Sequence, residues 1–133
     1  MASAGRILVV EDEHVLAQNV KTFLGRRFAD VRIAADGRHA MELMVSFAPD
    51  LVVLDYELPG ENGLQIYRKM VRHRGGAIRC VMVTGYPLDI VAQGANKLGI
   101  HHLLCKPFRL SELQQLIDRS GTEAFRDSLS DTR

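Results

Sequence analysis

Short apolar runs alternate along the chain with longer segments in which apolar residues recur every three or four positions. The runs at 7–10, 51–54 and 81–83 are wholly apolar and rich in valine, which is typical of strands buried on both faces. Less continuous runs at 31–34 and 100–104 predict two further strands. Each run precedes a segment whose periodicity predicts a helix with one buried face. The residues expected on these faces are Leu16, Val20, Phe23 and Leu24; Ala40, Met44 and Phe47; Leu64, Tyr67, Met70 and Val71; Val91, Ala95 and Leu98; and Leu110, Leu113, Leu116 and Ile117.

The alternation predicts five βα units and therefore an α/β fold. Strands with two apolar faces need helices on both sides, so we expect a single doubly wound domain with a five-stranded parallel sheet. Right-handed crossovers favour the flavodoxin-like strand order 2-1-3-4-5. Gly25 and Gly75 are expected to end the first and third helices, and Asp36 to cap the second. Gly94 is a weak point in the fourth helix, and the polar segment 121–133 is expected to extend the last helix and then fray.

Length, charge and cysteine content narrow the class of protein. The 133 residues fit one domain, and a net charge of +1 gives no electrostatic argument for nucleic acid binding. No apolar run approaches the ~18 residues that a membrane span requires, and the residues before the first strand are too few for a signal peptide. Cys80 and Cys105 lack metal-binding spacing. We therefore expect two reduced, partly buried thiols in a cytoplasmic protein that contacts neither nucleic acid nor membrane.

Polar residues with a chemical use follow four of the five predicted strands. Glu11 and Asp12 follow the first strand, Asp55 the third, Thr84 the fourth and Lys106 the fifth. In the expected strand order these four strands are neighbours, so their carboxyl ends should bring the side chains into one cleft. Taken singly, each residue has a structural explanation: acidic residues after a strand often only cap the next helix, Asp55 alone is a turn residue as often as a catalyst, and a lone Lys-Pro usually belongs to a surface loop. The combination at successive strand ends is what points to a functional site.

The expected cleft contains the groups that a phosphoryl transfer requires. Carboxylates such as Asp12 and Asp55 are the hard oxygen ligands that Mg²⁺ prefers. A strand-end carboxylate such as Asp55 can also attack phosphorus and form an aspartyl phosphate. Lys106 and Thr84 could then stabilise the charge on the phosphoryl oxygens with an ammonium group and a hydroxyl.

Four stretches of the chain carry a resemblance to a known family. The stretches 7–13, 54–63, 83–85 and 105–108 closely resemble the receiver domains of bacterial response regulators. The resemblance covers about residues 5 to 120, which implies a receiver domain at 1–120 followed by a C-terminal tail at 121–133. It also implies a two-component signalling protein that is phosphorylated and changes shape, and not a metabolic enzyme.

The resemblance implies a role for each matching residue. Asp55 matches the phosphoacceptor and a metal ligand, and Asp12 matches the direct ligand of Mg²⁺. Glu11 matches an acidic neighbour that often acts through a metal-bound water. Glu57 matches the position whose backbone carbonyl binds the metal.

The remaining matches concern the phosphoryl group itself. Thr84 matches the hydroxyl that contacts this group, and Lys106 matches the lysine that pairs with its oxygens. The bond from Lys106 to Pro107 matches one that is usually cis, which is accessible only before proline. Gly85 matches a position where a small side chain leaves the site open.

The implied partners are a sensor histidine kinase or a phosphotransfer protein as phosphoryl donor. The face built by the fourth helix, fifth strand and fifth helix is expected to contact a second copy of the chain or an output domain. Leu103 departs from the family, because members that couple the moving threonine to an aromatic rotation carry Tyr or Phe there. His102 and Tyr86 are the nearest substitutes for that aromatic residue.

Two other classes of protein share some of these features. Mg²⁺-dependent phosphohydrolases of the haloacid dehalogenase type also use a strand-end aspartate, but they usually need a second aspartate two residues later, where this chain has Glu57. A pseudo-receiver would bind partners without phosphorylation, although such proteins usually lose the acidic pair, the aspartate or the lysine. Turnover of a small phosphomonoester would identify the first alternative, and we expect none.

Overall fold

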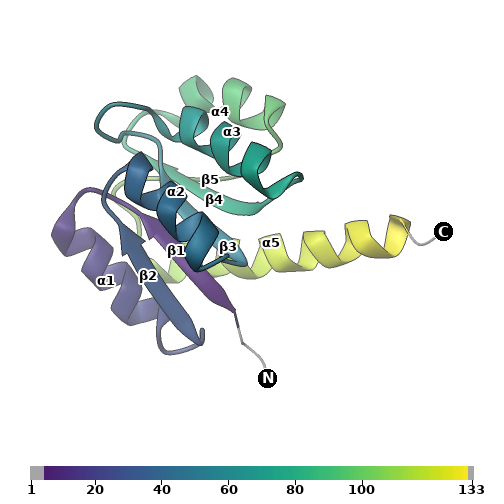
Figure 1. The fold of residues 1–133 in the computed structure, drawn as a ribbon, viewed down its shortest axis with the longest axis horizontal. Helices are drawn as coiled ribbons and strands as arrows, with labels where there is room; N and C mark the ends of the chain where they lie inside the picture. Colours follow the sequence, from purple (N-terminus) through teal and green to yellow (C-terminus); the bar gives the residue numbers. More distant parts are fainter. Residues whose placement is uncertain (1–4, 132–133) are drawn as a thin grey trace.

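The computed structural model describes residues 5–131, with side chains described as far as residue 121. Strands and helices alternate, as predicted (Figure 1). The elements are β1 (Arg6–Val10), α1 (His14–Leu24), β2 (Asp30–Ala34), α2 (Gly37–Ser46), β3 (Leu51–Asp55), α3 (Gly63–Arg74), β4 (Arg79–Thr84), α4 (Leu88–Lys97), β5 (His102–Cys105) and α5 (Leu110–Asp131).

The five strands form one parallel sheet in the order β2-β1-β3-β4-β5, which confirms the predicted order. The register aligns the carboxyl ends of the inner strands. Val10 pairs with Leu54, Asp55 pairs with Val83, and Thr84 pairs with Cys105. The residues that follow β1, β3, β4 and β5 therefore meet at one edge of the sheet.

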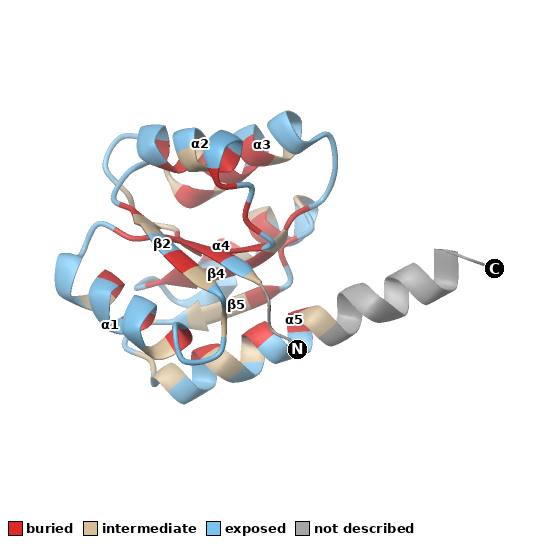
Figure 2. Ribbon diagram, turned by 60° about the horizontal axis from the view of Figure 1, so that its bottom comes forward, coloured by how far each residue is buried: buried red, intermediate tan, exposed pale blue. Residues whose placement is uncertain are grey.

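Each face of the sheet is covered by its own set of helices. Successive strand residues point to opposite faces, so Leu8 and Val10 pack with α2, α3 and α4, whereas Ile7 and Val9 pack with α1 and α5. Figure 2 shows buried positions on both sides of the sheet and exposed positions on the outer surfaces of the helices. Among the described residues, no helix combines the length and apolar character that crossing a bilayer requires.

Local signals fix the ends of several helices. Asp36 caps α2, where its carboxylate accepts a hydrogen bond of 2.9 Å from the amide of His39. Asn62 and Gln65 form a reciprocal capping box at the start of α3. Gly75 ends α3 with a φ of 79°, a left-handed conformation that glycine adopts without steric strain. The predicted roles of Asp36, Gly75 and Gly25 in ending or capping helices are confirmed.

Some predicted details differ in the structure. The fifth strand begins at His102, not at Ile100, because the Ile100 amide donates to the carbonyl of Ala95 at the end of α4. Ile66 occupies the buried face of α3, and Leu64 is only half-buried. Gly94 has a packing role beyond low helix propensity, since a Cβ there would lie 2.8 Å from the Leu64 side chain.

The two cysteines lie in different environments. Cys80 is buried, and burial raises the pKa of its thiol. Cys105 is exposed, so the expectation of two partly buried thiols is wrong for this residue. Helix α5 extends through the tail as far as Asp131, and the remaining two residues of the tail lie outside the described part of the chain.

Candidate functional site

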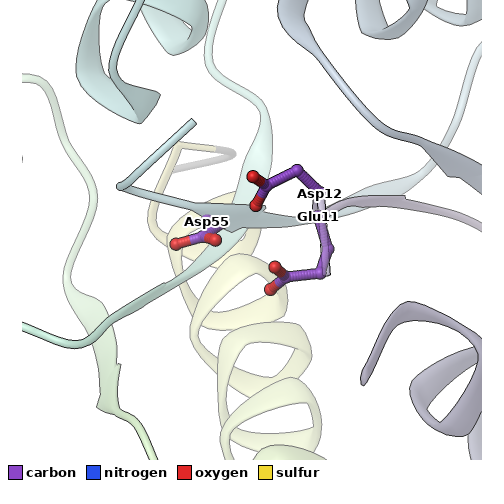
Figure 3. A group of neighbouring side chains, drawn as sticks. All are labelled: Glu11, Asp12 and Asp55. Atoms are coloured by element: carbon purple, nitrogen blue, oxygen red, sulfur yellow. The ribbon is translucent and has the colours of Figure 1, made fainter. Parts of the chain in front are cut away.

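Three carboxylates gather at the edge where β1 and β3 end. Glu11 and Asp12 follow β1, and Asp55 is the last residue of β3. One oxygen from each lies within 4.8 Å of the other two, and Figure 3 shows the three side chains directed toward one another. Asp55 is 1% exposed and Glu11 is 4% exposed, whereas Asp12 lies at the surface. The structure therefore confirms that these residues share one cleft.

The ammonium group of Lys106 lies among these carboxylates. Its Nζ is 2.9 Å from Asp55 Oδ2, 3.0 Å from Glu11 Oε1 and 3.3 Å from Glu13 Oε2. The Lys106 amide donates to the Thr84 carbonyl over 2.7 Å, which continues the pairing of β5 with β4. The peptide bond from Lys106 to Pro107 is cis, as the resemblance to receiver domains implies.

The charges in this cleft shift one another's pKa. Burial raises the pKa of Asp55 to about 7; the hydrogen bond from Lys106 opposes this rise, and the negative charge of Glu11 adds to it. Burial by itself would lower the pKa of Lys106, but its hydrogen bonds to Asp55 and Glu11 and their negative charges outweigh burial and raise it. Lys106 is therefore held in its charged form between two acidic groups.

Thr84 lies beside Asp55 at the end of β4 and is fully buried. Its hydroxyl donates to Oε2 of Glu57 and accepts a hydrogen bond of 3.0 Å from the amide of Tyr86. The Gly85 amide donates to the same carboxylate, 3.0 Å from Oε1. The Glu57 amide in turn donates to Asp55 Oδ1 over 3.0 Å.

The pKa of Glu57 reflects these contacts. Burial would raise it, but the hydrogen bonds from Thr84 and Gly85 outweigh burial, so the pKa of Glu57 is lowered. The Glu57 carboxylate thus accepts hydrogen bonds from Thr84 and Gly85, and the Asp55 side chain and the charge of Lys106 lower its pKa further. The expectation that its backbone carbonyl binds a metal stays a prediction.

The donor set at this edge suits a hard divalent cation. Glu11, Asp12 and Asp55 offer carboxylate oxygens close to one another, and Mg²⁺ is typically held by one or two carboxylates while keeping several water molecules. A cavity of about 550 Å³ opens beside Asp12, and its lining includes Asp36, Gly60 and Glu61. The acidic group is therefore accessible from solvent through the exposed side of Asp12.

Two residues take part in this arrangement in ways the sequence did not indicate. Glu13 is the N-cap residue of α1, but its side chain accepts no cap hydrogen bond and pairs with Lys106. Gly63 lets the start of α3 approach β3, since a Cβ there would lie 2.6 Å from the Asp55 carbonyl. Gly63 itself, the first residue of α3, is the sequence signal for this close approach.

Leu103 stands at the position where many receiver domains carry an aromatic residue. Leu103 is half-buried against the cluster formed with α2, α3 and α4. Tyr86 is 49% exposed, and its ring packs edge-on against the ring of Tyr56, with centroids 5.8 Å apart.

Two bacterial regulatory proteins match this chain over most of its length. The chain is 31% identical over 113 residues to the Regulator of RpoS of Escherichia coli, covering 84% of this chain and 33% of that protein. It is 36% identical over 110 residues to Response regulator MprA of Mycolicibacterium vanbaalenii, covering 81% of this chain and 46% of that protein. The chain thus spans a third to just under half the length of these relatives.

A solved structure and a family model also match the chain, and both belong to response regulators. A two-component response regulator of the LuxR family from Aurantimonas superposes with a TM-score of 0.79 and 29% identity, covering 88% of this chain and 84% of that chain. The model of the response regulator receiver domain matches residues 7–118. Since that match spans most of the chain and includes every residue of the acidic cleft, the chain belongs to the response regulator receiver domain family.

Proposed function

We propose that Asp55 accepts a phosphoryl group from a phosphohistidine of a sensor histidine kinase or a phosphotransfer protein. The observation that carries this proposal is the buried Asp55 carboxylate, with the Lys106 ammonium at 2.9 Å and oxygens of Glu11 and Asp12 within 4.8 Å. An Asp55 oxygen would bond to phosphorus as the phosphorus–nitrogen bond breaks, leaving the electron pair on the imidazole. Lys106 then pairs with the phosphoryl oxygens, and Thr84 donates to them.

We assign the Mg²⁺ site to the same edge of the sheet. Asp12 and Asp55 would supply direct carboxylate ligands, Glu11 would act through a water molecule, and the backbone carbonyl of Glu57 would supply a further oxygen. When bound, Mg²⁺ would relieve the repulsion among the carboxylates and neutralise charge on the phosphoryl oxygens. In this assignment the domain promotes its own phosphorylation and dephosphorylation and turns over no small metabolite.

The donor is expected to approach beside Lys106. A depression of about 340 Å³ is lined by Glu13, Leu16, Lys106, Pro107 and Phe108. The exposed Val15 lies next to Leu16 in sequence and adds apolar surface on α1. A partner helix carrying a phosphohistidine would find apolar contacts there and a route to Asp55.

The remaining assignments follow the resemblance to the family. Residues 1–120 form the receiver and 121–133 the tail, and the protein acts in the cytoplasm. Phosphorylation draws Thr84 and Lys106 inward, and the face of α4, β5 and α5 transmits this change to a second copy or an output domain. Leu103 replaces the usual aromatic residue, so transmission depends on movement of α4 and not on ring rotation.

Labelling of Asp55 tests the proposal directly. Incubation with acetyl phosphate and Mg²⁺ should add one phosphoryl group to the wild-type chain, measured by intact mass, and none to Asp55→Asn. Omitting Mg²⁺ should abolish labelling. Equal labelling of both chains would show that the acceptor is elsewhere. Absence of labelling in the wild type would favour a pseudo-receiver, and continuous turnover of a phosphomonoester would favour a hydrolase.

A further inference from the structure

The Glu57 carboxylate holds two hydrogen-bond donors beside Asp55. Its Oε2 accepts from the Thr84 hydroxyl, and its two oxygens lie 3.0 Å and 3.2 Å from the Gly85 amide nitrogen. A hydroxyl has one proton to donate. The Thr84 oxygen also accepts from the Tyr86 amide, so its orientation is fixed from both sides.

These donors are the ones that a phosphoryl group on Asp55 would need. While Glu57 accepts the proton of Thr84, that proton cannot be donated to a phosphoryl oxygen. A carboxylate and a phosphoryl group both carry negative charge, so they also repel each other at this short range. One of the two anions must leave the donors when the other occupies them.

We propose that Glu57 is a positioning residue that acts as an internal anion latch: its carboxylate holds the Thr84 hydroxyl and the Gly85 amide in the resting state, and the phosphoryl group displaces it. This inference rests on the proposed phosphorylation of Asp55 and adds a regulatory step at the same site. The latch sets a threshold for activation, because the hydrogen bonds to Glu57 must break before Thr84 can turn to the phosphoryl group.

The surroundings of Glu57 suit a group that can be released. The side chain is half-buried at the start of the loop after β3, so its carboxylate can reach solvent. Lys106 forms ion pairs with Glu11, Glu13 and Asp55, and no ion pair joins Glu57 to a cation among residues 5–121. Release therefore breaks the hydrogen bonds from Thr84 and Gly85 and gives up only the longer-range attraction of the Lys106 charge.

The backbone of Glu57 connects the latch to the reacting group. Its amide donates to Asp55 Oδ1 over 3.0 Å. Bonding of phosphorus to the Asp55 carboxylate would withdraw negative charge from that side chain and place the phosphoryl charge next to Glu57. Reaction at Asp55 thus both weakens the contact that positions Glu57 and repels its carboxylate.

Beryllofluoride can take the place of the phosphoryl group on Asp55. The concentration that half-saturates the full chain at saturating Mg²⁺ therefore measures how strongly Glu57 opposes occupation of the site. We expect Glu57→Ala to lower the half-saturating beryllofluoride concentration about tenfold, as loss of competing charge-assisted hydrogen bonds predicts. Glu57→Gln keeps the shape and one acceptor oxygen, so its effect should be intermediate. Both substitutions keep the backbone carbonyl assigned to the metal.

Two controls separate the latch from a general effect of charge. Asp89→Asn removes one negative charge from the exposed first turn of α4, four residues after Gly85, and it should change the half-saturating concentration by less than about twofold. In a Thr84→Ala background, Glu57→Ala should have at most about a threefold effect, since only the Gly85 hydrogen bond is left to release. The amide proton of Gly85 in the free protein should shift upfield in Glu57→Ala, because it loses a charged acceptor.

Each outcome has a distinct meaning. An unchanged half-saturating concentration in Glu57→Ala, or an equal gain in Asp89→Asn, would overturn the latch while leaving the assignment of Asp55 intact. Additive effects of Glu57→Ala and Thr84→Ala would overturn it as well. If the wild type itself fails to bind beryllofluoride with Mg²⁺, the proposed function fails, whatever the variants show. An unshifted Gly85 amide would contradict the resting hydrogen bond directly.

Discussion

The middle and the carboxyl end of the same strand are buried to the same degree but contain opposite kinds of side chain. Along β3, Leu51–Leu54 lie in the two apolar clusters, whereas the next residue, Asp55, is a carboxylate that is 1% exposed. Burying apolar side chains stabilises the folded state, and burying a charge destabilises it unless the charge is paired. The interior of the sheet therefore provides the stability that allows charged groups to be held at its end.

The pairing at the strand ends is incomplete in the absence of a cation. Lys106 contacts Asp55, Glu11 and Glu13, so one ammonium group serves three carboxylates. Burial and the charge of Glu11 still raise the pKa of Asp55 to about 7. The middle of β3 therefore stabilises the folded state through apolar packing, whereas the carboxylates at its end destabilise it through mutual repulsion. Substitutions in each region can test this difference.

The largest effect is expected in the strand middle. Leu54→Ala removes a fully buried side chain from the cluster packed against α2, α3 and α4. It should lower the free energy of unfolding by ~3 kcal/mol, since both transfer free energy and packing contacts are lost. Urea unfolding followed by circular dichroism measures this. Val45→Ala, at a position 66% exposed on α2, is the matched control and should change stability by less than ~0.5 kcal/mol. Similar losses in both variants would contradict the comparison.

A substitution at the carboxyl end of β3 is expected to raise the free energy of unfolding. Asp55→Asn removes a buried carboxylate and should stabilise the metal-free protein by ~2 kcal/mol at pH 7.5. Because the pKa of Asp55 is raised from 3.8 to about 7, the folded protein keeps a proton that the unfolded chain releases. Stability of the wild type should therefore fall as the pH rises from about 4 to about 7, a slope that Asp55→Asn lacks.

Unfolding curves in chelator at several pH values would measure this slope. If the free energy of unfolding changed with pH in the same way in the wild type and in Asp55→Asn, Asp55 would not be the group whose pKa is raised by folding. Addition of Mg²⁺ should reduce the stability difference, because a bound cation favours the carboxylate.

A smaller effect is expected on Mg²⁺ affinity, which should depend on Asp12 more than on Glu13. Asp12→Asn should weaken Mg²⁺ binding about tenfold, because it removes a carboxylate from a site that depends on one or two of them. Glu13→Gln should weaken it less than about twofold, since Glu13 lies outside the three-carboxylate group. Mg²⁺ titration monitored by amide chemical shifts at pH 8 provides both values. Equal losses would show that the metal ligands have been assigned to the wrong residues.

The smallest effect is expected for the ammonium group. Lys106→Gln removes a positive charge 2.9 Å from Asp55 that opposes a cation in the same cleft. We expect Mg²⁺ to bind roughly two- to fivefold more tightly to this variant, in the same titration. Weaker binding would mean that Lys106 positions the carboxylates more than it competes with the metal.

Much of the site could be predicted because parallel strands align their carboxyl ends. Once the apolar runs had fixed five parallel strands, Asp55, Thr84 and Lys106 had to meet at one edge. What could not be predicted was the direction of flexible acidic side chains. Glu13 lies at the start of α1, but its side chain caps no amide of that helix and reaches Lys106, which is 93 residues away in the sequence.

The sequence by itself determined the order of the elements, the strand order and the family, since these depend on periodicity and on motifs that are local along the chain. Only the tertiary structure decided that Glu57 holds Thr84 and Gly85, that Gly94 is packed against Leu64, and that Cys105 lies at the surface. Such features depend on contacts between residues distant in sequence. A side chain with several rotatable bonds chooses its partner only after the fold has fixed which donors and acceptors lie within reach.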